Sequence, residues 1–413
     1  MLSNWLAHVP PDSCSGGADR AKKLAICVIR IMHVITGLDV GGAEVMLQKL
    51  IEHSDRYRFE HIVISLMDLG IIGERLKKLG VEVHALGGPR GYPTWRVIRG
   101  LMMLARQTRP TIVQGWMYHG NLAAWLVQRF AAGTPPMIWG IRQSLGQLSD
   151  EKRLTQLVIR ASALVSATVD TVVYNAQRSR VQHEAAGFSG RSSMVIPNGF
   201  DTARYIPSFS AKADLCGELE LPDDVFLIGL IGRFHPMKDH RGFLDAVTEV
   251  ARRHNKVRVL MVGEGVSWSN PELSGWVRER RLEDHVYLLG RRDDVPRITA
   301  ALDVAVSASA RNEGFANVIG EAMSCGVPCI VTDVGDSASI VSDTGSVVPP
   351  GNPSRLAAAI CEFVELTSGE REQMGLSARA RVVSEFSVEK IIGRFEALYS
   401  KIAEGRVSQQ PIA

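Results

Sequence analysis

The feature that most constrains this chain is a repeated alternation between short apolar runs and amphipathic segments. In the first half, strands are predicted at 30–37, 59–67, 81–86, 111–116, 136–142 and 171–176, with helical periodicity at 43–53, 73–79 and 94–107. In the second half, strands are predicted at 225–234, 257–265, 286–290, 302–309 and 328–333, with a helix at 243–254. This alternation predicts an α/β fold built from parallel sheets with right-handed crossovers.

The length of the chain sets the number of domains. Its 413 residues suggest two domains, at roughly 100–200 residues per domain. A polar stretch at 200–224, which contains Pro207 and Pro222, separates the two series of strands. We therefore expect one doubly wound domain over 29–205 and a second over 206–386, facing each other across a cleft. Residues 1–28 are expected to form a disordered extension.

The composition excludes several classes of protein. Hydrophobic residues make up 46% of the chain and charged residues 22%, as in an ordinary globular protein. Six scattered cysteines form no CxxC pair, so we expect neither a zinc site nor a disulfide framework, and a cytoplasmic location. No apolar run reaches the ~18 residues needed to span a bilayer.

The charge is unevenly distributed. Up to Tyr205 the chain has 24 basic and 15 acidic residues, whereas the remainder has 23 basic and 29 acidic residues. No acidic residue lies between Glu82 and Asp150, and that interval holds seven arginines: Arg90, Arg96, Arg99, Arg106, Arg109, Arg129 and Arg142. The interval is either a solvated face or a surface for anionic lipid headgroups or a phosphorylated substrate. We expect no nucleic-acid partner.

Three motifs follow predicted strands, where ligands bind in doubly wound sheets. The first is Gly41-Gly42-Ala43-Glu44, in which the two glycines allow close backbone approach to an anion. It is equally compatible with a plain strand-to-helix turn. The chain lacks a GxGxxG motif, which weakens a nicotinamide-binding interpretation.

The second motif is Gly232-Arg233-Phe234-His235-Pro236-Met237-Lys238. Arg233 and Lys238 would place two cations at the cleft, where a leaving diphosphate needs them. The alternative is two ordinary surface cations.

The third motif runs from Glu313 to Met323. If a helix begins near Asn317, Glu321 lies one turn inside it and Glu313 remains in the preceding loop. The helix amides would suit a phosphate, and the carboxylates would suit sugar hydroxyls. Alternatively, Glu313 lies in an exposed loop and Glu321 pairs with a core lysine or arginine.

Together with Gly263-Glu264-Gly265 and Gly345–Pro350, these motifs resemble those of glycosyltransferase family 4. The resemblance covers about residues 29–400 and is most specific over 229–350. It implies the GT-B fold, two Rossmann-like domains, and transfer of a sugar with retention of anomeric configuration. Bacterial cell-surface polysaccharide glycosyltransferases, which build exopolysaccharide or O-antigen units on a lipid carrier, are the most similar subset.

The resemblance also implies roles in the second domain. Arg233 and Lys238 would bind the donor diphosphate, Glu313 the donor sugar, and Glu321 the nucleotide ribose. The loop amides of Phe315, Ala316, Asn317 and Val318 would contact phosphate and sugar. Gly263, Glu264 and Arg292 would lie near the base.

In the first domain, which would bind the acceptor, the implied donor contacts are Gly41, Gly42 and the catalytic His119. Asn198 would lie at the domain junction. The C-terminal helix, 387–404, would pack back on this domain.

The implied mechanism is a front-face transfer in which the leaving diphosphate takes the acceptor's proton. The chain shows no DxD-like motif in a suitable loop, so we expect no catalytic metal and no cofactor besides the nucleotide-sugar, with UDP favoured over GDP. The expected acceptor is a glycan or a polyprenyl-diphosphate-linked sugar, reached by peripheral contact with the inner face of the cytoplasmic membrane. The alternatives are a UDP-sugar 2-epimerase of the same fold and a catalytically silent nucleotide-sugar-binding subunit.

Overall fold

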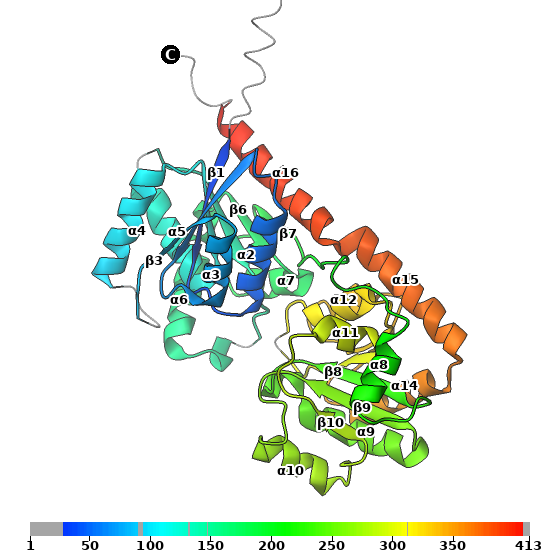
Figure 1. Ribbon diagram of the computed structural model, residues 1–413. Helices are drawn as coiled ribbons and strands as arrows, with labels where there is room; N and C mark the ends of the chain where they lie inside the picture. Colours follow the sequence, from blue (N-terminus) through cyan, green and yellow to red (C-terminus); the bar gives the residue numbers. More distant parts are fainter. Residues whose placement is uncertain (1–27, 90–93, 131–132, 147, 312, 408–413) are drawn as a thin grey trace, which may run out of the picture.

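A computed structural model describes residues 28–89, 94–130, 133–146, 148–311 and 313–407. The expected extension at 1–28 lies outside these residues apart from Val28, and so does Arg90 of the basic interval. Figure 1 shows two α/β domains side by side, with a long pair of C-terminal helices running along both of them.

The first domain is built on a seven-stranded parallel sheet with the order β3-β2-β1-β4-β5-β6-β7. Its strands are β1 (Ile29–Ile35), β2 (Phe59–Ser65), β3 (Glu82–Ala85), β4 (Ile112–Trp116), β5 (Met137–Ile141), β6 (Thr171–Tyr174) and β7 (Ser193–Val195). Its helices are α2 (Gly42–His53), α3 (Gly70–Lys78), α4 (Trp95–Thr108), α5 (Met117–Phe130), α6 (Arg153–Val165) and α7 (Gln177–Ala185), with short 3-10 turns η1 (Leu148–Asp150) and η2 (Ser166–Thr168).

The second domain is built on a six-stranded parallel sheet with the order β10-β9-β8-β11-β12-β13. Its strands are β8 (Phe226–Ile231), β9 (Val257–Val262), β10 (Val286–Leu288), β11 (Val304–Ser307), β12 (Cys329–Thr332) and β13 (Ser346–Val348). Its helices are α8 (Ala211–Glu218), α9 (His240–Arg253), α10 (Pro271–Glu279), α11 (Val295–Ala300), α12 (Asn317–Ser324), α13 (Ser337–Val341), α14 (Pro353–Glu365) and α15 (Ser368–Phe386), with one 3-10 turn, η3 (Pro236–Lys238).

Both sheets therefore share the Rossmann strand order, which places a topological switch point between β1 and β4 and another between β8 and β11. The strands are nearly continuous apolar runs because parallel strands are covered by helices on both faces. In the first domain, α2 and α3 cover one face of the sheet and α4, α5 and α6 cover the other. In the second domain, α9, α10 and α14 lie on one face, opposite α8, α11 and α12.

The last helix, α16 (Val388–Val407), belongs to the core of the first domain although it follows the second in the sequence. Its buried residues pack with those of α2 and β1: Val388, Ile391, Ile392, Phe395, Leu398 and Tyr399. The chain returns to the first domain between Phe386 and Val388, beside Phe200. The Phe200 amide donates to Phe386 O (2.8 Å), and its carbonyl accepts from Val388 N (2.9 Å).

Some sequence expectations were wrong in detail. The polar stretch at 200–224 is not only a linker, because it contains α8, whose Ala211, Leu215 and Cys216 are buried in the second domain. The short edge strands β7 and β13 were not predicted, since each begins with a serine and neither forms an apolar run of the length seen in the other strands. Arg142 of the basic interval is buried rather than on a face, and its Nη1 donates to Ile196 O (2.7 Å).

Candidate active site

The centre of the site is a contact between the loops that follow β8 and β11, at the switch point of the second sheet. Lys238 Nζ lies 2.6 Å from Glu313 Oε2, and Ser309 Oγ donates to the same oxygen (2.8 Å). Both partners of the ion pair are largely buried, with side-chain exposures of 18% and 13%. Lys238 and Glu313, predicted from separate motifs, therefore form one cluster, with Ser309 as a member that sequence reasoning missed.

Local structure fixes the position of Lys238. It ends η3, where His235 Nδ1 accepts from Met237 N (3.2 Å) and holds the turn. Asp239 follows with a left-handed φ of 49° and caps α9 by accepting from Gly242 N (3.0 Å). The turn thus points the lysine back over the end of β8.

Arg233 lies beside this cluster at the end of β8. Its side chain is exposed, and within the described residues we find no hydrogen bond or ion pair for its guanidinium. It is therefore available to an anionic ligand, as expected of a diphosphate contact.

Gly263 closes the neighbouring loop, after β9. Its φ is 155°, and a Cβ there would lie 2.1 Å from Gly232 O, so only glycine allows the two loops to touch. Phe234 N donates to Glu264 O (2.7 Å), while the Glu264 side chain is exposed. The loop after β9 thus supports the backbone that carries Arg233.

The start of α12 offers amides but few side chains. Phe315 is buried and stacks on Phe200 with ring centroids 5.8 Å apart, and Ala316 is buried as the N-cap residue. Asn317 Oδ1 accepts from Asn198 Nδ2 (2.8 Å), which joins the two domains. The first amides of a helix have no intrahelical partner, so those near Val318 remain suited to an anion.

Glu321 has partners of its own. Its carboxylate is hydrogen-bonded to the Tyr205 hydroxyl and feels the charges of Lys49 and Arg204. Burial raises its pKa, an effect that Lys49 and Tyr205 oppose. Lys49 also donates to Gly199 O (2.9 Å) at the domain junction. Lys49 acts on Glu321 as a nearby charge and not as an ion-pair partner within 4 Å, so both the pairing with a lysine and the ribose role stay predictions.

Arg292 also has partners of its own. Its Nε donates to Asp294 Oδ1 (2.8 Å), and its Nη2 donates to Glu218 Oε1 (2.8 Å) and Asp294 Oδ2 (2.9 Å). These bonds, with those of Arg297, tie the loop after β10 to α8 and lower the pKa of Asp294. Its Nη1 makes no hydrogen bond to a described residue, so the guanidinium keeps that nitrogen for a ligand.

In the first domain, Gly41 is the N-cap of α2 and Gly42 its first residue. A Cβ on Gly41 would lie 2.3 Å from Glu44 Oε2, so a larger residue would displace that carboxylate.

His119 lies in the first turn of α5, directly after β4. Its Nε2 is buried with no hydrogen-bond partner among the described residues, and burial lowers its pKa.

The carboxyl edges of the two sheets face each other. Ser144 Oγ, after β5, donates to Glu313 O (3.0 Å). Asp336, after β12, accepts from the amides of Gln177 (2.6 Å) and Arg178 (3.0 Å) at the start of α7. Sequence reasoning missed these contacts, because single polar residues in loops carry no periodic signal.

Two family models match the chain: "Glycosyltransferase Family 4" over residues 40–204 and "Glycosyl transferases group 1" over residues 225–365. N-acetyl-alpha-D-glucosaminyl L-malate synthase of Bacillus anthracis is 32% identical over 38% of this chain and 40% of its own length. UDP-Gal:alpha-D-GlcNAc-diphosphoundecaprenol alpha-1,3-galactosyltransferase of Escherichia coli is 28% identical over 50% of this chain and 53% of its own length. These matches thus span about half the length of the two relatives or less.

Solved structures agree on the fold. The crystal structure of Anabaena HepE in complex with UDP superposes with a TM-score of 0.80, at 23% identity, over 90% of this chain and all of that one. The family models, the two Rossmann-like sheets and the facing loops lead to one assignment: the chain belongs to the family 4 glycosyltransferases and has the GT-B fold.

Proposed function

We propose that this enzyme transfers a sugar from a nucleotide-sugar, a UDP-sugar before a GDP-sugar, to a lipid-linked glycan acceptor, with retention of configuration. The observation that carries the proposal is the buried Lys238–Glu313 pair at the switch point of the second sheet. The name of the Escherichia coli relative gives a UDP-sugar donor and a diphosphoundecaprenol acceptor, and HepE was crystallised with UDP. Both support the choice of substrates.

The chemistry follows from the charges. In the front-face reaction, the bond between the sugar carbon and the diphosphate breaks as the acceptor oxygen attacks from the same side. The acceptor's proton passes to the leaving phosphate oxygen. Lys238, Arg233 and the α12 amides would stabilise the charge that develops on the diphosphate, which is electrostatic catalysis by groups already in place. Glu313 would accept hydrogen bonds from the sugar hydroxyls.

The test separates binding from transfer. We expect UDP to raise the melting temperature of the wild type, by an amount equivalent to ~2.7 kcal/mol at 100 times its dissociation constant. Lys238→Met should weaken UDP binding, whereas Glu313→Gln should keep UDP binding and lose sugar transfer. Lys256→Met, which removes an exposed lysine paired with Asp224 in the same domain, is the matched control and should behave as the wild type. A protein that melts normally but responds to no nucleotide would contradict the proposal.

Glu321→Gln tests the ribose role in the same screen. The role requires the carboxylate to accept hydrogen bonds from the ribose hydroxyls, and a neutral amide accepts them less strongly. The variant should therefore bind UDP less tightly while its unliganded melting temperature changes little. Unchanged UDP binding with altered unliganded melting would assign Glu321 to the domain junction alone.

Product analysis distinguishes the two enzyme activities considered from the sequence. A transferase forms a new glycoside only when an acceptor is present. A 2-epimerase would form a sugar isomer without one.

A further inference from the structure

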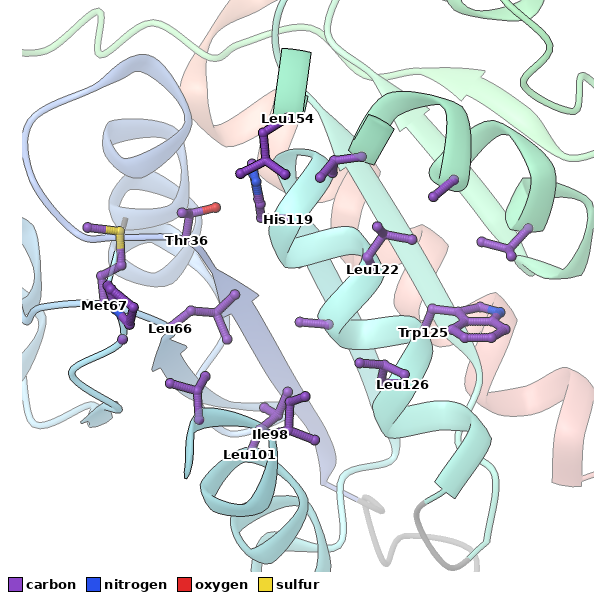
Figure 2. A pocket seen from close by; sticks show the side chains of 17 residues that line it. Thr36, Leu66, Met67, Ile98, Leu101, His119, Leu122, Trp125, Leu126 and Leu154 are labelled. Atoms are coloured by element: carbon purple, nitrogen blue, oxygen red, sulfur yellow. The ribbon is translucent and has the colours of Figure 1, made fainter. Parts of the chain in front are cut away.

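A partly open apolar cavity of about 400 Å³ lies in the first domain, between α4, α5 and α6 (Figure 2). Its lining is almost wholly apolar: Thr36, Leu66, Met67, Gly88, Pro89, Val97, Ile98, Leu101, His119, Leu122, Ala123, Trp125, Leu126, Leu154, Val158, Ala161 and Val165. Trp125 Nε1 already donates to Thr168 Oγ1 (3.1 Å). Polar groups therefore face the cavity only from Thr36 and His119 among these residues.

These two polar residues lie at one end of the cavity, and Ile98, Leu101 and Leu126 lie toward the other (Figure 2). Thr36 follows β1 and His119 follows β4, so the polar end is at the switch point of the first sheet, on the edge that faces the second domain. The His119 Nε2 is buried and without a partner among the described residues, so the wall at this end contains an unsatisfied polar atom.

The opposite end lies next to a surface groove, since Ile98 and Leu126 line both spaces. The other residues of the groove are Trp95, Arg99, Met102, Met103, Arg106, Gln107 and Phe130. Trp95 is 76% exposed and Phe130 is 63% exposed. Arg99 and Arg106 are the cations of the groove, within the interval that has no acidic residue. Exposed aromatics beside cations are typical of contact with an anionic lipid surface.

The helix α6 adds a second apolar feature. Leu154, Val158, Ala161 and Val165 repeat at helical spacing and face the cavity, although Leu154 is 45% exposed. An apolar wall that stays open to solvent is unfavourable unless a ligand covers it. The volume is within the ~300–1,000 Å³ of small-molecule sites and exceeds twice the ~150 Å³ cavity that takes up one benzene.

We propose that this cavity binds a hydrocarbon chain of the acceptor lipid. The head of the acceptor, with its sugar and diphosphate, would lie in the cleft beyond Thr36 and His119, next to the donor sugar. The chain would run from there through the cavity and leave by the groove, toward a membrane whose anionic headgroups meet Arg99 and Arg106. The inference rests on the proposed function, since it names the part of the acceptor that this domain recognises. The apolar chain would then add to the specificity that the glycan head provides.

The experiment uses the full chain and 11-bromoundecanol, whose bromine quenches a tryptophan that it touches. We expect saturable quenching of the wild type that Trp125→Phe reduces. Ala161→Phe should place a ring in the space that the chain would occupy and weaken binding by about tenfold or more. Leu164→Phe is the matched control: it adds a ring on the same helix at a residue that is 84% exposed and does not line the cavity, so its binding should equal that of the wild type.

Equal quenching in the wild type, Ala161→Phe and Leu164→Phe would overturn the proposal, as would quenching that never saturates. UDP thermal shifts are measured on the same proteins to separate this proposal from the transferase proposal. A UDP shift in every variant without chain binding in the wild type refutes only the cavity assignment. Chain binding without any nucleotide shift would instead refute the donor proposal.

Discussion

At the scale of single residues, Gly320 shows how a position can be fixed by a distant ring. It lies inside α12, where glycine is unfavourable, and its neighbours in the sequence offer no reason for it. A Cβ there would lie 2.1 Å from Cε2 of Phe200. Phe200 in turn packs on Phe315 and bonds the backbone at the end of α15. The glycine therefore lets the domain junction pack against the helix that follows Glu313.

We predict that Gly320→Ala destabilises the protein by about 1–3 kcal/mol, because the new methyl group overpacks the site. Gly393→Ala is the control, since a Cβ on that α16 glycine meets nothing within 4 Å. It should be neutral or stabilise by up to about 1 kcal/mol. Denaturant midpoints measure both, and equal midpoints for the two variants would contradict the packing argument.

A buried pair of histidines makes stability depend on pH. Trp116 Nε1 donates to His33 Nδ1 (3.1 Å), so His33 carries its proton on Nε2 and donates it to His61 Nδ1 (2.9 Å). Burial lowers the pKa of both rings, that of His61 to about 4. A second proton on His33 would sit on Nδ1 and face the N–H of Trp116, which is a further reason for the His33 ring to stay neutral.

The sign of the pH effect follows. A histidine of the unfolded chain has a pKa of about 6.5, so below that pH the unfolded chain binds protons that the folded chain does not bind. The contribution of these histidines to the free energy of unfolding is therefore complete above pH 6.5 and is lost as the pH drops toward 4. The slope is about 1.4 kcal/mol per pH unit for each such histidine. The variant His61→Gln keeps an acceptor for the His33 proton. Its melting temperature should fall less steeply than that of the wild type as the pH is lowered from 7 to 5. An unchanged slope would exclude His61 as a source.

At the scale of elements, α16 contributes buried residues to the core of the first domain, although it follows the second domain in the sequence. Phe395 and Tyr399 are buried in the first domain, and the Tyr399 hydroxyl donates to Gln114 Oε1. The helix α15 is set separately, by a capping box between Thr367 and Glu370. The two helices meet at Ser387, beside Phe200, where the chain passes from the second domain back to the first (Figure 1).

We predict that Phe395→Ala destabilises the first domain by about 3–5 kcal/mol, the usual effect of removing a buried aromatic ring. Glu389→Ala, at an exposed position of the same helix, should change stability by no more than about 0.5 kcal/mol. Chemical unfolding followed by tryptophan fluorescence gives both values. Similar midpoints for the two variants would show that α16 adds little to this core.

At the scale of the whole molecule, a few contacts hold the facing edges together. Helix α7 has no cap from its own side chains, and the carboxylate of Asp336 in the other domain accepts from its first amides. Arg178 adds an exposed ion pair with Asp333 (2.8 Å), of a kind that contributes little. Asp336 is therefore the stronger of the two closing contacts.

We predict that Asp336→Ala shifts the unliganded molecule toward an open arrangement. Loss of a helix cap is worth about 1 kcal/mol, which changes an equilibrium by about fivefold. Small-angle X-ray scattering should then give a larger radius of gyration, while donor addition restores the wild-type value. Asp343→Ala, an exposed carboxylate of the same domain, is the control. A radius equal to that of the control would contradict a closing role for Asp336.

Part of the site could be predicted from the sequence because its signals are local. The strands after which Arg233, Lys238 and Glu313 lie are apolar runs, and the helix does begin at Asn317. The engagement of Arg292 with Glu218 could not be predicted, since the two are 74 residues apart and belong to different elements. Lys49 was likewise missed, because a lysine in an amphipathic helix gives no sign of a partner in another domain.

The sequence by itself determined the alternation of strands and helices, the two domains and the motifs after the strands. These depend on periodicity and on residues close together in the chain. Only the tertiary structure decided that Lys238 meets Glu313 across 75 residues, that Glu321 faces Tyr205 and Lys49, and that His119 ends an apolar cavity. Such contacts depend on strand order and on how the two domains close, and both are set by packing between distant segments.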